Sequence, residues 1–163
     1  MKWTDLSEQQ CSVARSSSVL GDRWTLLILC DCFLGVRRFE DFQQRLGLSR
    51  TTLANRLQLL EDHEILSRIP YQEKPTRYEY RFTEKGLALY PIITSVVDWG
   101  DKYYADAAGP PIIRQHTTCG HDFHSVSVCS ECGEAVDPHE VVARKRSENS
   151  KFSPVLRGPI EQD

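Results

Sequence analysis

Cysteine and histidine side chains near the end of the chain have the spacing of metal ligands. His116 and Cys119 are three positions apart, as are Cys129 and Cys132, and a glycine follows the second member of each pair. Two such ligands can hold one ion through a tight turn, and the glycine permits the positive φ that the turn often needs. Three thiolates and an imidazole make a closed four-coordinate site, so we predict a structural zinc ion in a zinc-ribbon-like segment.

Other interpretations of this segment stay open on the sequence alone. His121 and His124 lie close enough to replace His116 as the fourth ligand. Cys129 and Cys132 could instead form a redox dithiol, or the cysteines could bind no metal. The repeated pair of ligands favours zinc over both of these alternatives.

Polar side chains on one predicted helix form a second candidate site. The helix begins at Ser49, whose hydroxyl can cap it, and Gly47 provides the tight turn before it. Leucines recur at helical spacing and commit one face of the helix to a core. The opposite face and its flanks carry Arg50, Thr51, Asn55, Arg56 and Gln58.

These residue types suit the edges of DNA base pairs and the phosphates beside them. Asparagine and glutamine can pair bidentately with adenine, and arginine can bind phosphate. Between Arg37 and Leu57, five arginines stand against two acidic residues, although the whole chain has a net charge of -3. The predicted DNA contacts are Arg37, Arg38, Ser49, Arg50, Thr51, Thr52, Asn55, Arg56, Gln58, Lys74 and Arg77.

The elements that must position both sites follow from the hydrophobic pattern. Helices are predicted over Cys11–Leu20, Arg23–Phe33 and, as a pair joined by a turn, Arg37–Asp62; strands over Ile65–Tyr71 and Arg77–Phe82; and a long helix over Glu84–Asp106. Pro91 lacks a backbone N–H, so we expect a kink there or a helix that starts nearer the proline. The apolar content of this last helix exceeds what a small core can cover, and we expect a homodimer.

The sequence therefore predicts a mainly α fold with a small β-wing (α+β), which is a winged helix-turn-helix with a small zinc-ribbon-like appendage. We place the DNA-binding and dimerisation domain at 1–106, a linker at 107–111, the zinc-ribbon-like segment at 112–143 and a disordered tail at 144–163. The chain has 163 residues, of which 40% are hydrophobic. Because it has neither an apolar run of about 20 residues nor a signal pattern, we expect a cytoplasmic protein.

Several blocks of this sequence closely resemble the HxlR-type family of winged helix-turn-helix transcriptional regulators. They are GDRWTLLIL at 21–29, RRF at 37–39, LSRTTLANRLQLLEDHEIL at 48–66, RYEYRFTEKG at 77–86 and PIITSVVDWG at 91–100. The resemblance implies a homodimeric regulator of double-stranded DNA. It places the helix from Ser49 in the major groove and the wing on adjacent backbone, and it assigns the dimer to the terminal helices.

The resemblance also bears on Cys11, which matches a redox or electrophile sensor in some relatives. Plain packing near a dimer interface is the alternative role for this cysteine. Repression is the expected sign of regulation, because blocking a promoter needs no further contacts.

Two competing functions come from other classes of protein. One is a thiol oxidoreductase that uses Cys129 and Cys132. The other is an interaction module in which the winged helix no longer reads DNA and the ribbon binds protein. The second ligand pair argues against the first, and the polar face between Arg50 and Gln58 argues against the second. The sequence contains no catalytic constellation, so we do not expect an enzyme.

Overall fold

The computed structural model describes residues 6–143, which fall into two compact units. The first unit ends at Tyr104 and the second begins at Ala105. We describe each unit by itself. In the described residues, no helix is long and apolar enough to cross a membrane.

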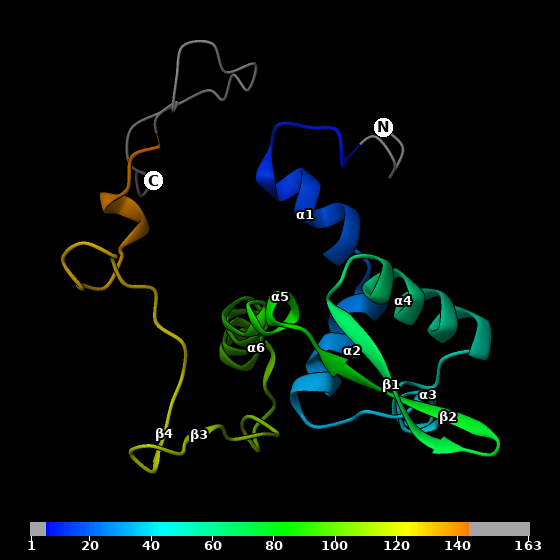
Figure 1. Ribbon diagram of the computed structural model, residues 1–163. Helices are drawn as coiled ribbons and strands as arrows, with labels where there is room; N and C mark the ends of the chain where they lie inside the picture. The colour runs from blue at the N-terminus through cyan, green and yellow to red at the C-terminus, as the bar shows by residue number, and fades with distance from the viewer. Residues whose placement is uncertain (1–5, 144–163) are drawn as a thin grey trace. The chain divides into compact units, whose positions relative to one another are not determined.

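Four helices open the first unit, within two residues of their predicted bounds (Figure 1). They are α1 (Ser12–Leu20), α2 (Arg23–Phe33), α3 (Phe39–Leu46) and α4 (Arg50–Asp62). Side chains cap two of them: Asp22 accepts the backbone N–H of Trp24 at 3.0 Å, and Ser49 accepts that of Thr52 at 3.1 Å. Both contacts satisfy donors that a helix start otherwise leaves unpaired. Gly47 ends α3 with a φ of 63°, which makes the turn into α4.

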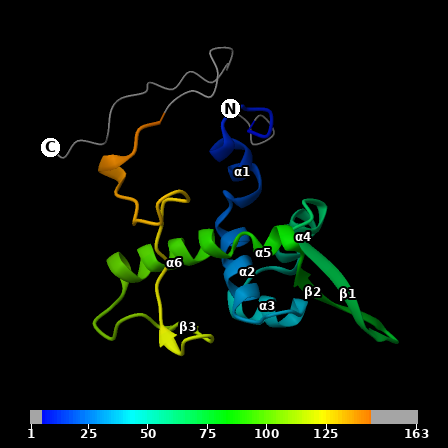
Figure 2. The same ribbon diagram turned by 60° about the vertical axis from the view of Figure 1, so that its left-hand side comes forward.

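A two-stranded wing follows the helix-turn-helix. Strand β1 (Leu66–Glu73) pairs antiparallel with β2 (Thr76–Phe82), and the register runs from Leu66 opposite Phe82 to Glu73 opposite Thr76. The segment before α3 joins the outer side of β2 through the backbone N–H of Tyr80, which donates to the Arg37 carbonyl at 2.8 Å. Figures 1 and 2 show the hairpin projecting beyond the helices.

The predicted long helix is wrong as a single element, because the chain forms α5 (Glu84–Leu87) and then α6 (Tyr90–Tyr104). Pro91 has no N–H to donate to the preceding turn, so α5 cannot continue through it. The alternative, a helix that starts nearer the proline, is confirmed. Figures 1 and 2 place α6 on the side of α2 away from the wing.

The core of the first unit surrounds α2 and the inner faces of α3 and α4. Ile28, Leu29, Phe42, Leu53 and Leu60 have no solvent exposure. The leucines of α4 are thus the apolar face that their spacing predicts. Packing of this face, more than helix propensity, holds α4 in place.

The second unit contains little regular structure. Its elements are β3 (Gln115–His116), β4 (His121–Asp122) and the short 3-10 helix η2 (Pro138–Glu140). Most of its side chains are exposed. The predicted tail at 144–163 lies outside the described residues.

Candidate nucleic-acid interface and cysteine knuckles

The outward face of α4 carries the side chains that were predicted to meet base pairs. Thr51, Asn55 and Gln58 are all exposed, and Ala54 is exposed beside them. Sequence reasoning missed Ala54 because a small apolar residue gives no signal of its own, yet its methyl group can contact the methyl of thymine. The face therefore offers two amides, a hydroxyl and a methyl group.

Gln58 is held by a neighbour one helical turn away. Its Nε2 donates to Asp62 Oδ1 at 2.8 Å. This bond occupies one of the two amide hydrogens, so the carbonyl oxygen and the other hydrogen remain for a further partner. Asp62 is a residue near the candidate interface that the sequence analysis did not consider.

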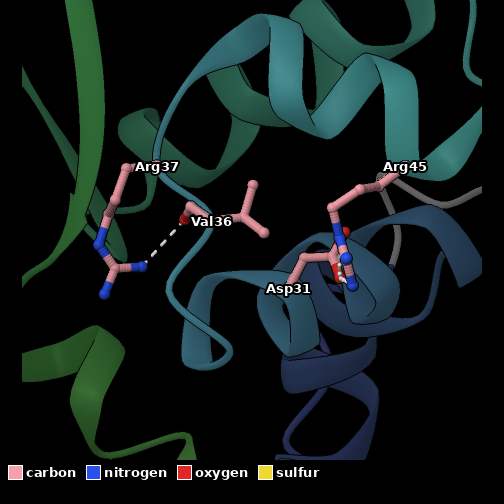
Figure 3. Close-up of polar contacts among 4 residues, drawn as sticks. All are labelled: Asp31, Val36, Arg37 and Arg45. Carbon is pink, nitrogen blue, oxygen red and sulfur yellow. Dashed lines mark hydrogen bonds and ion pairs between the residues drawn. The ribbon is translucent and has the colours of Figure 1, made fainter.

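Three arginines of this region make contacts inside the protein. Arg37 donates to the carbonyl oxygen of Cys32 in the last turn of α2 and to that of Val36 in the segment after it. Arg45 pairs with the buried Asp31 at 2.9 Å (Figure 3). These contacts tie α2 to the segments that follow it.

The third is Arg56, whose Nε lies 3.0 Å from Asp22 Oδ1. Asp22 also caps α2, so one carboxylate joins α2 to α4. Both side chains are about one third exposed. Of the predicted DNA contacts, Arg37 and Arg56 therefore already have internal partners. The side chains of Ser49 and Thr52 also bond each other, at 2.8 Å.

The remaining arginines lie over aromatic rings. The guanidinium of Arg50 is 4.8 Å from the centre of the Phe39 ring, and that of Arg38 is 4.4 Å from the centre of the Tyr71 ring on the wing. Both arginines are exposed. A ring can fix a guanidinium without satisfying its hydrogen-bond donors, which leaves them available for phosphate.

The wing carries further exposed cations. Lys74 lies in the turn between β1 and β2, and Arg77 is near the start of β2. Arg68, which the sequence analysis did not single out, lies 4.6 Å from the centre of the Tyr78 ring and 3.5 Å from Glu61. The pairing of Arg68 across the strands could only be found once the register was known.

In the second unit, the two predicted ligand pairs lie in equivalent hairpins. The Gly120 N–H donates to the His116 carbonyl at 2.7 Å, and the Gly133 N–H donates to that of Cys129 at 2.9 Å. Both glycines have positive φ, 73° and 76°. The ladders match as well: Gln115 pairs with Asp122, and thirteen residues later Val128 pairs with Ala135. The repeated spacing thus corresponds to a repeated backbone turn.

Each hairpin suits half of a tetrahedral zinc site. His116 Nδ1 lies 3.3 Å from Cys119 Sγ, close to the separation of about 3.5 Å that two ligands of one tetrahedral zinc ion would have. Backbone N–H groups of Cys132 and Glu131, followed by the Cys132 side chain, lower the pKa of Cys129. Within residues 6–143, however, no three histidine, cysteine or acidic side chains are gathered closely enough to hold a metal. Zinc binding therefore stays a prediction.

The other cysteines belong to the first unit. Cys11 is half-buried and occupies the N-cap position of α1. Cys32 is fully buried, and burial raises the pKa of its thiol to about 12, against the opposing effect of Arg37. A thiol with that pKa is unreactive at neutral pH. Cys32 belongs to the core of the first unit, and the half-buried Cys30 packs against it.

One face of α6 is apolar and exposed. Ile92, Val96 and Trp99, together with Pro91 and Ser95, line an open groove of about 520 Å³. Trp99 is 56% exposed, and its ring lies 5.7 Å from that of Tyr103, which is 59% exposed. An apolar surface of this kind marks an interaction site.

The profile of a protein family described as HxlR-like helix-turn-helix matches residues 19–108. An uncharacterised HTH-type transcriptional regulator of Mycobacterium tuberculosis strain H37Rv is 42% identical over 130 residues, which are 80% of this chain and 82% of that protein. Because the first unit ends at Tyr104, an alignment of this length must reach into the second unit.

Solved structures show the same fold. PA1607, described as a candidate transcription factor, superposes with a TM-score of 0.77 at 31% identity, over 88% of this chain and 99% of that chain. The oxidised form of the redox regulator HypR superposes with a TM-score of 0.55 at 28% identity, over 59% of this chain and all of that chain. The winged helix architecture of the first unit is therefore shared with transcription factors.

Proposed function

This chain belongs to the HxlR-like helix-turn-helix family of transcriptional regulators, and we propose that it represses transcription as a homodimer that reads operator DNA with α4. The family is a class of DNA-binding regulators and not of enzymes. The observation that carries the proposal is the exposed face of α4, where polar side chains stand opposite a fully buried row of leucines. Binding is an equilibrium and involves no chemistry on a substrate.

The structure supports a division of roles among the predicted DNA contacts. Thr51, Asn55 and Gln58 read base edges, since they are exposed on one face. Arg38, Arg50, Lys74 and Arg77 bind phosphate, because they are exposed and have no carboxylate partner among the described residues. Arg37, Ser49, Thr52 and Arg56 position the helices through the internal contacts described above. Two α4 helices related by a twofold axis would read half-sites one helical turn, or a multiple, apart.

A binding experiment with the full chain tests this function. Fluorescence anisotropy with the DNA upstream of the protein's own gene, compared with scrambled DNA of equal length, should show at least a hundredfold preference at physiological salt. Adding a chelator, which would remove zinc from the second unit, separates the competing functions. DNA binding that survives this treatment belongs to the winged helix alone. Equal affinity for both DNAs would favour the interaction module, in which the winged helix no longer reads sequence.

The apolar groove on α6 supports the homodimer. A second copy would cover Ile92, Val96 and Trp99, which water otherwise contacts. Val96→Asp places a charge in this surface and should convert the dimer to a monomer in analytical ultracentrifugation. Gln44→Asp puts the same charge at an exposed position of α3 and should leave the dimer intact. A dimer that survives Val96→Asp would place the interface elsewhere.

Zinc bound by His116, Cys119, Cys129 and Cys132 completes the proposal. The donor set fits zinc, and the two hairpins have the same backbone turn, in which the glycine N–H donates to the carbonyl of the first ligand residue. The ion would hold the two hairpins together as one structural site. All four coordination positions would be filled by protein ligands, so none would be open to a substrate. His121 and His124, both exposed, remain the alternatives to His116 as fourth ligand.

Cys11 is the candidate redox or electrophile sensor. Its half-buried position at the start of α1 leaves it accessible, and a solved relative, HypR, is called a redox regulator. Oxidant should weaken DNA binding by the wild type and have no effect on Cys11→Ser. Equal sensitivity of the two proteins to diamide would assign Cys11 to packing alone.

A further inference from the structure

A cavity of about 300 Å³ lies between α1, the start of α2 and α4. It is lined by Ser18 and Val19 of α1, by Asp22, and by Arg56 and Leu59 of α4. This volume is at the lower end of the range for small-molecule sites, about 300 to 1,000 Å³. The walls combine two apolar side chains, a hydroxyl group and an ion pair. Such a mixture of apolar surface and a few polar groups is typical of a ligand site.

The ion pair in this cavity leaves hydrogen-bonding atoms unused. Asp22 Oδ1 accepts the backbone N–H groups of Trp24 at 3.0 Å and Thr25 at 3.4 Å. Arg56 Nε lies 3.0 Å from the same oxygen as an ion pair, but it is buried without a hydrogen bond among the described residues. Two backbone donors and one charged nitrogen therefore lie around a single carboxylate oxygen. Within the described residues, no hydrogen bond engages Asp22 Oδ2 or the terminal nitrogens of Arg56. An acceptor and a pair of donors thus belong to adjoining side chains of the same cavity.

We propose that this cavity binds a small uncharged molecule that carries a carboxamide edge and an apolar remainder. Its carbonyl oxygen accepts from the terminal nitrogens of Arg56, and its N–H donates to Asp22 Oδ2. The apolar remainder contacts Val19 and Leu59. The carboxylate of Asp22 would repel an anion, and the guanidinium of Arg56 would repel a cation. Because the two charges balance each other, the ion pair selects a neutral ligand that has both a donor and an acceptor.

The position of the cavity gives this ligand a regulatory consequence. Arg56 follows Asn55 in α4, so the occupant lies against the body-facing side of the helix that we propose reads DNA. A ligand with different affinities for the free and DNA-bound protein changes DNA affinity by the same factor. This consequence rests on the proposed function, whereas the binding itself does not.

Binding can be measured without DNA on the full-length protein labelled with ¹⁵N. Benzamide is the probe, because it has a carboxamide edge and an apolar ring. Backbone amides of Ser18, Asp22 and Leu59 should shift saturably, with a dissociation constant on the order of millimolar for a ligand of this size. Benzoate has the same shape but carries a charge and no N–H, and it should bind at least roughly tenfold more weakly.

Two variants assign the site. Asp22→Asn keeps an N-cap for α2, as asparagine caps well, but removes the carboxylate, and it should weaken benzamide binding by roughly tenfold. Ser18→Leu fills the cavity, leaves the ion pair in place and should abolish the titration. The proposal is overturned if benzamide gives no saturable shifts, if benzoate binds equally well, or if either variant binds benzamide as the wild type does.

Discussion

At the scale of single residues, the arginines of the helix-turn-helix divide by what they contact. Arg45 and Arg56 pair with carboxylates, and Arg37 donates to backbone carbonyls. Arg38 and Arg50 lie over aromatic rings, which leaves their donors to solvent. We therefore expect phosphate binding from the second group, whereas removal of a member of the first group should change the stability of the folded protein.

Asn55 and Arg50 should have different effects on DNA binding. Asn55→Ala removes the proposed base contact and should reduce discrimination at one base pair by about 1 to 3 kcal/mol. Arg50→Ala removes the proposed phosphate contact, so it should weaken binding to all DNA and lower the salt slope by about one. Both are measured by anisotropy titrations over a range of salt, with operators changed one base pair at a time.

Arg56→Ala is the matched control for that experiment. Because its partner Asp22 is partly exposed, the loss of the pair should cost no more than about 1 kcal/mol of folding stability and leave the salt slope unchanged. A slope lowered by Arg56→Ala and unchanged by Arg50→Ala would reverse these assignments.

Cys32 should make stability depend on pH in the alkaline range. Burial raises the pKa of its thiol from 9.0 to about 12, so the unfolded chain loses this proton at a lower pH than the folded protein. The stability that this pKa difference contributes is fully present below pH 9 and is lost as the pH rises toward 12. Denaturant titrations at pH 8 and pH 10.5 should show a larger loss of stability for the wild type than for Cys32→Ala. Equal losses would mean that water reaches this thiol in the folded state.

At the scale of elements, the junction after the wing decides where α5 and α6 lie. Thr83 caps α5 by accepting the Gly86 N–H at 3.1 Å, and its hydroxyl donates to the Glu64 carbonyl at 2.6 Å. α5 therefore lies directly against Glu64 and Ile65, the residues that lead into β1. This contact fixes the direction in which the chain leaves the wing for α6.

Gly86 is required by that close approach. A Cβ atom at this position would lie 2.2 Å from the Ile65 carbonyl oxygen and 2.7 Å from the Phe82 ring. Gly86→Ala must therefore displace backbone and should lower stability by about 2 to 4 kcal/mol. Gly100→Ala is the control, since nothing lies within 4 Å of its Cβ in α6, and it should be neutral or raise stability by up to about 1 kcal/mol. Equal thermal melts for the two variants would show that α5 can move away from β1 without cost.

At the scale of the whole molecule, the two units differ in what stabilises them. The first has a buried core, whereas most side chains of the second are exposed. A segment with so little buried apolar surface needs another source of stability, and we propose that zinc bound by the two ligand pairs supplies it. Loss of the metal should therefore unfold the second unit and spare the first.

Zinc content and melting test this separation in one set of proteins. The wild type should contain one zinc ion per chain by atomic absorption, and Cys132→Ser should lose it. Amide signals of the second unit should then collapse to random-coil positions, while the thermal transition of the first unit is unchanged. Ser130→Ala, between the same two cysteines, should keep both the zinc and the signals. A metal-free wild type with dispersed signals from residues 112–143 would contradict the zinc site.

The sequence alone determined the features that depend on neighbours along the chain. Three such local patterns are the apolar period of α4, its cap at Ser49 and the repeated spacing of the two ligand pairs. The structure has the same helix, cap and turns. The tertiary structure decided which arginines are free for DNA, because Asp31 lies fourteen residues from Arg45, and the two meet only once α2 and α3 pack. The close approach of Gly86 to Ile65 and the cavity beside Arg56 likewise exist only in the folded structure. Such contacts depend on distances in space, which the periodicity of a sequence does not encode.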